Sequence, residues 1–129
     1  MALRVLVIDD EPLTLEMLSV MLEMERFQVT TALSIPDAWE ILTYEPLPDV
    51  ICSDLMLPGI TGLDFLAQRN EKPEVADIPV VIITGCSKQD WLDEAKRLGA
   101  YACLPKPFEM KELASLLVQA TYNNILMPV

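Results

Sequence analysis

The sequence predicts one α/β domain with a doubly wound, five-stranded parallel sheet built from five successive βα units. Three observations predict this fold. The length of 129 residues suits a single domain, which we expect to span residues 1–129. Short apolar runs alternate with longer segments of helical periodicity. Each connection between apolar runs is long enough for a crossover helix, so neighbouring strands are expected to run parallel, with helices covering both faces of the sheet.

The first strand is predicted at Arg4–Ile8, a short run rich in β-branched residues that ends abruptly at Asp9. Pro12 follows at a position suited to the first turn of a helix. Apolar residues then recur at helical spacing and form one stripe, which consists of Leu13, Met17, Val20, Met21 and Met24. We expect this methionine-rich stripe to fill the core of the domain.

The second βα unit begins with a strand at Phe27–Ala32. Ser34 stands three residues before Asp37, a spacing typical of a capped helix start, and Pro46 breaks this helix. The third strand is predicted at Val50–Ser53, immediately before Asp54.

Turn residues at 58–62 separate the third strand from the rest of the chain. The remaining predicted elements are a helix over 63–70, a strand at Ile78–Thr84, a helix from Ser87 to Gly99, a strand at Tyr101–Leu104 and a helix at Glu109–Thr121. Ser87 is predicted to cap the fourth helix, and Gly99 occupies the position where a helix commonly ends in glycine.

Composition and charge exclude several classes of function. Nine Lys and Arg against twenty Asp and Glu give a net charge of −11, which disfavours direct binding to nucleic acid or to anionic membranes. No apolar run approaches the roughly 18 residues of a membrane span, and Asp9 comes too early for a signal peptide, so we expect a cytoplasmic protein. The chain has no histidine. Its three cysteines, which include Cys52 and Cys86, have no C-x-x-C spacing and are expected to be reduced.

Polar side chains follow four of the five predicted strands. These residues are Asp9, Asp10, Asp54, Thr84 and Lys106. In an open parallel sheet, ligands bind outside the carboxyl ends of the strands. If the first and third strands are neighbours, the three aspartates converge and need a cation to offset their repulsion. Because the candidate ligands are oxygen atoms, they favour Mg²⁺.

Four motifs occur in order at these strand ends. They are Asp9-Asp10, the segment Asp54–Gly62, Thr84-Gly85 and Lys106-Pro107-Phe108. Through them, essentially the whole chain resembles the receiver (REC) domain of two-component response regulators. The resemblance implies a CheY-like, flavodoxin-like fold with strand order 2-1-3-4-5, which brings the first and third strands together.

The resemblance also implies a site. Asp54 resembles the phosphoacceptor, which takes a phosphoryl group from the phosphohistidine of a sensor histidine kinase or a phosphotransfer protein. Asp9 and Asp10 resemble the acid pair that binds Mg²⁺ together with the Asp54 carboxylate and the backbone carbonyl of Met56.

Five further positions carry expectations from the same resemblance. Lys106 and the Thr84 hydroxyl are expected to contact phosphoryl oxygens, with the small Gly85 leaving room for them. Pro107 permits a cis peptide bond. Cys103 stands where the family has an aromatic switch residue. The signal is expected to leave through the face of the fourth helix, fifth strand and fifth helix, towards a downstream protein target or an output domain.

On this interpretation the chain is a switch that catalyses its own phosphorylation and dephosphorylation, and no enzyme with a separate substrate. The main alternative is a receiver-like scaffold that accepts no phosphate, which the presence of Asp54, Lys106 and the acid pair disfavours. An aspartyl-phosphate phosphohydrolase would have a D-x-D motif after the first strand, where Asp9 and Asp10 are adjacent. An FMN carrier would need a phosphate-binding loop there, and these acids with Glu11 would repel it.

Overall fold

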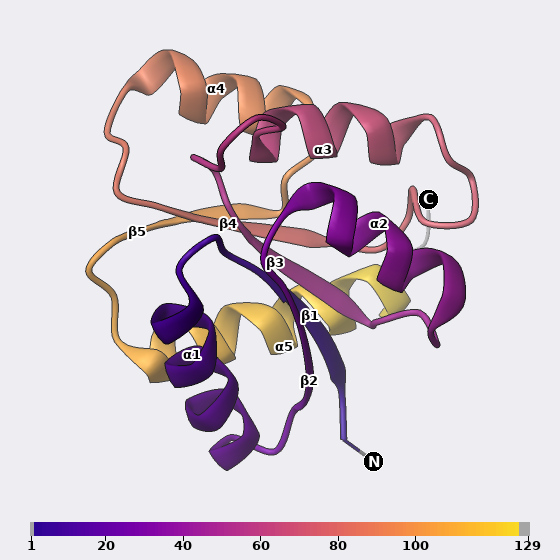
Figure 1. Cartoon of the computed structure of the whole chain (residues 1–129), viewed down its shortest axis with the longest axis vertical. Helices are drawn as coiled ribbons and strands as arrows, with labels where there is room; N and C mark the ends of the chain where they lie inside the picture. The colour runs from indigo at the N-terminus through magenta and orange to yellow at the C-terminus, as the bar shows by residue number, and fades with distance from the viewer. Residues whose placement is uncertain (1, 127–129) are drawn as a thin grey trace.

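Five parallel strands form a single sheet in the computed structural model, which describes residues 2–126 (Figure 1). The strands are β1 (Arg4–Ile8), β2 (Gln28–Ala32), β3 (Val50–Asp54), β4 (Val80–Thr84) and β5 (Ala102–Pro105). Their spatial order is β2-β1-β3-β4-β5, and every neighbouring pair is parallel. The predicted fold class and strand order are confirmed.

Five helices connect and follow these strands, and they cover both faces of the sheet. They are α1 (Pro12–Met24), α2 (Ile35–Tyr44), α3 (Gly62–Asn70), α4 (Gln89–Arg97) and α5 (Met110–Leu126). Helices α1 and α5 lie on one face, and α2, α3 and α4 lie on the other (Figure 1). Within residues 2–126, no helix combines the length and apolar character that crossing a membrane requires.

Alternation along each strand divides the core into two layers. Val5 and Val7 of β1 belong to the cluster under α1 and α5, whereas Leu6 and Ile8 belong to the cluster under the other three helices. All five residues of β3 and of β4 are buried, as expected for central parallel strands that are covered on both faces. The loops that follow β3 and β4 therefore start from fully buried strands.

The helix ends agree with the sequence at three of four predicted positions. Pro12 lies in the first turn of α1, as predicted. Ser34 Oγ accepts a hydrogen bond of 3.2 Å from the Asp37 backbone N–H, and Gly99 has a φ of +99°, which suits glycine just after α4. The prediction that Ser87 caps α4 is wrong. The capping position is Lys88, one residue later, and its side chain makes no capping hydrogen bond.

The prediction that the methionine-rich stripe of α1 fills the core is also wrong. Its five members, Leu13, Met17, Val20, Met21 and Met24, are between 37% and 77% exposed. The helix instead buries Leu15, Leu18 and Leu22. Because α1 is apolar on more than one side, its sequence contains two helical stripes, and packing against β1 and α5 selects the leucine stripe.

Candidate functional site

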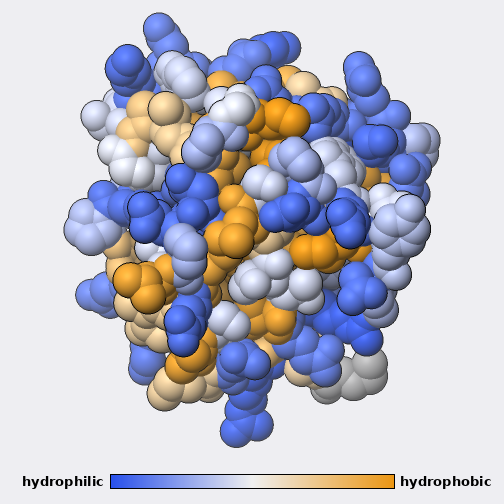
Figure 2. All heavy atoms as spheres, viewed as in Figure 1, coloured by the Kyte–Doolittle hydropathy of each residue, from blue (hydrophilic) through white to orange (hydrophobic). Residues whose placement is uncertain are grey.

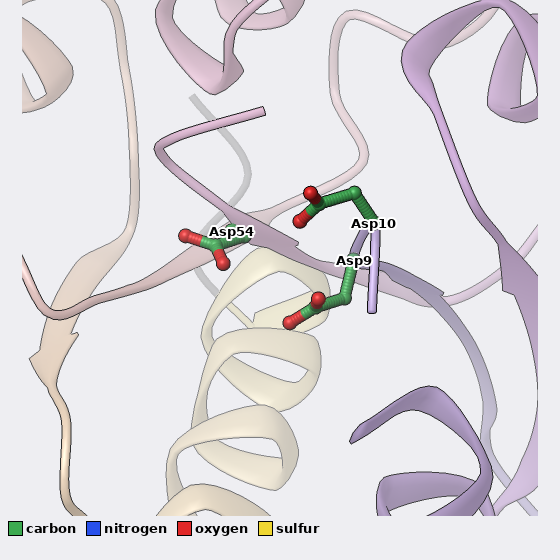
Figure 3. Close-up of side chains that lie close together, drawn as sticks. All are labelled: Asp9, Asp10 and Asp54. Carbon is green, nitrogen blue, oxygen red and sulfur yellow. The ribbon is translucent and has the colours of Figure 1, made fainter. Parts of the chain in front are cut away.

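The carboxyl ends of β1 and β3 bring three carboxylates together. Asp9 directly follows β1, and Asp54 is the last residue of the neighbouring strand β3, where Ile8 pairs with Ser53. One carboxylate oxygen from each of Asp9, Asp10 and Asp54 lies within 4.8 Å of the other two. Figure 3 shows the three side chains close together, with the carboxylates of Asp9 and Asp10 on the side that faces Asp54. We call this arrangement the acidic pocket.

Backbone N–H groups fix two of these carboxylates. Asp9 Oδ1 accepts a hydrogen bond of 2.9 Å from the Glu11 N–H, and Asp54 Oδ1 accepts one of 3.2 Å from the Met56 N–H. Both aspartates are buried, whereas Asp10 is exposed. Asp9 Oδ2 is buried without a hydrogen-bond partner in the described part of the chain. A buried, unpartnered carboxylate oxygen is costly unless a ligand satisfies it.

Lys106 brings the positive charge to the acidic pocket. Its Nζ donates a hydrogen bond of 3.0 Å to Asp54 Oδ2 and lies 3.6 Å from Asp9 Oδ2. Its backbone N–H donates to the Thr84 carbonyl at 2.8 Å, which ties the residue to the end of β4. One ammonium group faces three carboxylates, so the acidic pocket retains excess negative charge.

This crowding changes the proton affinity of the buried groups. Burial raises the pKa of Asp9 above its usual range, and the negative charges of Asp54 and Asp10 add to the increase, while the Glu11 N–H and Lys106 oppose it. Burial alone would lower the pKa of Lys106. Its hydrogen bond to Asp54 and the two neighbouring negative charges outweigh burial, so the pKa of Lys106 is raised.

Thr84 and Gly85 lie at the end of β4, next to the strand that carries Asp54. Thr84 is buried, and its Oγ1 accepts a hydrogen bond of 2.9 Å from the Cys86 N–H. Gly85 is exposed, and a Cβ added there would meet no atom within 4 Å. The space next to Gly85 is therefore open. The backbones of β3 and β4 are hydrogen-bonded at this edge, since the Leu55 N–H donates to the Ile83 carbonyl at 3.2 Å.

The other predicted residues lie around or away from the acidic pocket. Met56 follows Asp54 closely in the chain, and the residue is 49% exposed. The Lys106–Pro107 peptide bond is cis. Cys103 lies farther back in β5, where it is partly buried against the cluster under α2, α3 and α4. The structure thus gathers the aspartates and Lys106 and leaves Cys103 within the sheet.

Comparison with known proteins identifies the arrangement. The response regulator receiver domain model matches residues 5–118. The chain belongs to this receiver family. This confirms the predicted resemblance, and membership implies a histidine kinase as partner of the domain.

Individual receivers show the same relationship. The phosphate regulon transcriptional regulatory protein PhoB of Escherichia coli is 36% identical over 115 residues, which cover 89% of this chain and 50% of PhoB. The chain therefore spans about half the length of that relative. A receiver domain protein from Clostridium thermocellum has 29% identity and a TM-score of 0.89, with 98% of this chain and 99% of that chain covered. Chemotaxis regulator CheY4 of Vibrio cholerae has 27% identity and a TM-score of 0.84, over 93% and 99% respectively.

The receiver's acidic pocket has the donor set of a site for a hard metal cation. The three carboxylates offer oxygen atoms within 4.8 Å of one another, and Asp9 Oδ2, although 3.6 Å from Lys106 Nζ, accepts no hydrogen bond in the described residues. Neither nitrogen nor sulfur ligands belong to this group. Carboxylate oxygens suit Mg²⁺, Mn²⁺ or Ca²⁺ better than Zn²⁺ or Cu²⁺. The residues of this receiver therefore fit a divalent cation.

Sequence reasoning missed the structural role of Gly62 in this receiver. A Cβ on Gly62 would lie 2.6 Å from the Asp54 carbonyl oxygen and 3.0 Å from Leu55 Cα, so the start of α3 packs directly against the backbone after Asp54. Thr61 and Asp64 hold this start by a reciprocal capping box. Glycine near the end of the Asp54 motif was the available signal, but it predicted only a turn.

Proposed function

We propose that residues 1–129 form one cytoplasmic receiver domain that acts as a Mg²⁺-dependent phosphoacceptor switch. Asp54 accepts a phosphoryl group from the phosphohistidine of a sensor histidine kinase or a phosphotransfer protein. The observation that carries this proposal is the 3.0 Å hydrogen bond from Lys106 Nζ to Asp54 Oδ2 inside a cluster of three carboxylates. This bond distinguishes Asp54 from the other two acids, since Lys106 holds its reactive oxygen next to a positive charge.

Burial further supports Asp54 as the nucleophile. The side chain of Asp9 is 1% exposed, whereas that of Asp54 is 11% exposed and opens towards the strand ends. An Asp54 carboxylate oxygen attacks phosphorus, and the phosphorus–nitrogen bond of the donor breaks. The electron pair of that bond returns to the imidazole, and the product is an acyl phosphate on Asp54.

The other groups of the acidic pocket would bind the metal ion and the phosphoryl group. The carboxylates of Asp9, Asp10 and Asp54 and the backbone carbonyl of Met56 would hold Mg²⁺, which when bound supplies positive charge to carboxylate and phosphoryl oxygens. Lys106 then pairs with one phosphoryl oxygen.

Other groups act on the phosphorylated form. The Thr84 hydroxyl donates to a second phosphoryl oxygen, in the open space above Gly85. Attack of water on phosphorus later releases phosphate and restores Asp54, so the same groups serve phosphorylation and dephosphorylation. The change passes to the face formed by α4, β5 and α5, which meets a downstream target or an output domain. Cys103 occupies the switch position on that face.

Phosphorylation by a small donor tests the proposal without a kinase. After incubation with acetyl phosphate and Mg²⁺, intact mass spectrometry should detect one added phosphoryl group, and chelation of the metal should prevent it. Asp54→Asn should abolish the addition. Asp90→Asn is the matched control, because Asp90 is an exposed acid in the first turn of α4 and should leave the addition unchanged. A phosphorylated Asp54→Asn protein would overturn the assignment.

A further inference from the structure

The open side of β2 has backbone groups that no other part of the described chain satisfies. β2 ends the strand order and pairs only with β1 in the described sheet. The Gln28 N–H donates to Leu3, and the Ala32 carbonyl accepts from Asp9, so these residues bond towards β1. Because peptide groups alternate along a strand, those of Val29 and Thr31 point to the open side.

This edge also lacks the usual features that prevent strand addition. Proteins commonly protect an exposed edge with lysine, proline or a bulge. The five residues of β2 read Gln-Val-Thr-Thr-Ala, and their register with β1 is continuous from Gln28 to Ala32. Valine and threonine favour extended backbone, so the strand is preorganised for a further partner.

Two grooves flank the carboxyl end of the edge strand. A groove of about 500 Å³ lies between β2 and α2, and one of about 370 Å³ lies between β2 and α1. Both grooves include Thr31 and Leu33, so they meet at the carboxyl end of β2. Figure 2 views this side of the molecule and shows hydrophobic side chains in the middle of the face, with hydrophilic ones around them. Side chains that alternate along an added strand would enter the two grooves in turn.

The charged residues of these two grooves are all acidic, whereas a third groove of about 300 Å³ along residues 28–30 contains Arg4 as well as Glu45. Asp37, Glu40 and Glu45 line the first groove, and Glu16 lines the second. Neither lining contains Lys or Arg. This charge selects a basic occupant and disfavours a second copy of the chain, which has a net charge of −11 and would place the same carboxylates opposite themselves.

We propose that the β2 edge binds an extended, basic segment of a partner protein as a sixth strand. The backbone of this segment pairs with Val29 and Thr31. Its apolar side chains pack on the apolar parts of the grooves, and its Lys or Arg side chains face the carboxylates of α1 and α2. This surface is separate from the α4–β5–α5 face and does not depend on the phosphoacceptor function.

The test uses a capped eight-residue peptide in which the unit Val-Val-Lys-Lys occurs twice, so that each face of the added strand presents both valine and lysine. Titration into the isotopically labelled full chain should give a Kd of about 100 µM by NMR, with amide shifts centred on residues 28–33. A second peptide, N-methylated at the amides of one edge, should bind at least about tenfold more weakly, because it cannot form the ladder. A valine–glutamate peptide should not bind.

Two variants test the charge of the first groove. Glu40→Gln combined with Glu45→Gln should weaken binding of the valine–lysine peptide about threefold or more at low salt. Glu109→Gln combined with Glu112→Gln changes two exposed acids near the start of α5 and should have no effect.

Several results would overturn the proposal. They are no binding up to about 1 mM, equal binding of the N-methylated or valine–glutamate peptide, and shifts that concentrate at the acidic pocket. Sedimentation could instead show that the chain dimerises, with NMR shifts at the Val29 and Thr31 amides when the dimer forms. That result would assign the edge to a second copy and would also overturn the proposal.

Discussion

Asp9 and Asp10 of the acidic pocket come just before α1 in the chain, yet the pocket and the outer face of α1 break the usual rule of burial in opposite ways. The pocket buries charged side chains, whereas the outer face of α1 exposes apolar ones. In the acidic pocket, the charged residues Asp9 and Asp54 as a whole are only 1% and 8% exposed. On α1, Leu13 and Met24 are apolar side chains more than three-quarters exposed. Strand ends dictate the first arrangement, because a parallel sheet directs its terminal side chains to one edge. Helix rotation dictates the second, and the sequence of α1 permits more than one rotation.

Neighbouring substitutions on α1 test this rotation and should give the largest effect. Leu18 is 2% exposed and Met17 is 56% exposed. Leu18→Ala should lower the free energy of unfolding by about 3 kcal/mol, because it leaves a cavity in the core. Met17→Ala should change it by about 0.5 kcal/mol or less, because the side chain is already in water. Urea denaturation measures both, and a larger loss for Met17→Ala would show that the stripe is buried after all.

The charge balance of the acidic pocket gives the next effect. Asp10→Asn removes a candidate metal ligand and should weaken Mg²⁺ binding about tenfold or more. Lys106→Met removes a cation from among three carboxylates, so Mg²⁺ should bind equally or more tightly. Isothermal titration calorimetry compares both variants with Asp90→Asn as control. Equal weakening in Asp10→Asn and Lys106→Met would contradict the proposed division of roles.

The rim of the acidic pocket should give a smaller effect on the lifetime of the phosphorylated form. Met56 lies close to Asp54 in the chain, and Cys86 bonds to Thr84. Neither side chain orients an attacking water well, since a thioether is a weak acceptor and a thiol a weak donor. Met56→Asn or Cys86→Glu should therefore speed loss of phosphate by about threefold to tenfold.

The decay is followed by intact mass after removal of acetyl phosphate. Met17→Asn is the matched control, because it places the same change on the exposed face of α1. Unchanged decay in both rim variants, or faster decay in the control, would show that the rim does not limit access of water.

The strand ends were easier to predict from the sequence than the buried face of α1. The ends of β1 and β3 were predicted to within one residue, because central parallel strands read as continuous apolar runs that stop at a charge. Convergence of Asp9 and Asp54 required the strand order, and that order came from the resemblance to receivers. Composition and spacing alone left it open.

The remaining errors have physical causes. Leu15, Leu18 and Leu22 recur at helical spacing as the methionine-rich stripe does, so periodicity alone could not choose the buried face of α1. The close packing of Gly62 on Asp54 depends on how the loop after β3 folds back, and a turn signal carries no such information.

Chemical mapping of the phosphorylated residue tests the central claim most directly. Borohydride reduces an acyl phosphate of aspartate to homoserine, so the modified position becomes a stable mass difference. After acetyl phosphate treatment with Mg²⁺, tandem mass spectrometry of the reduced and digested protein should find homoserine at Asp54. Homoserine at Asp9 or Asp10 instead, or at no aspartate, would contradict the account of the acidic pocket as a phosphoacceptor site built around the Lys106–Asp54 pair.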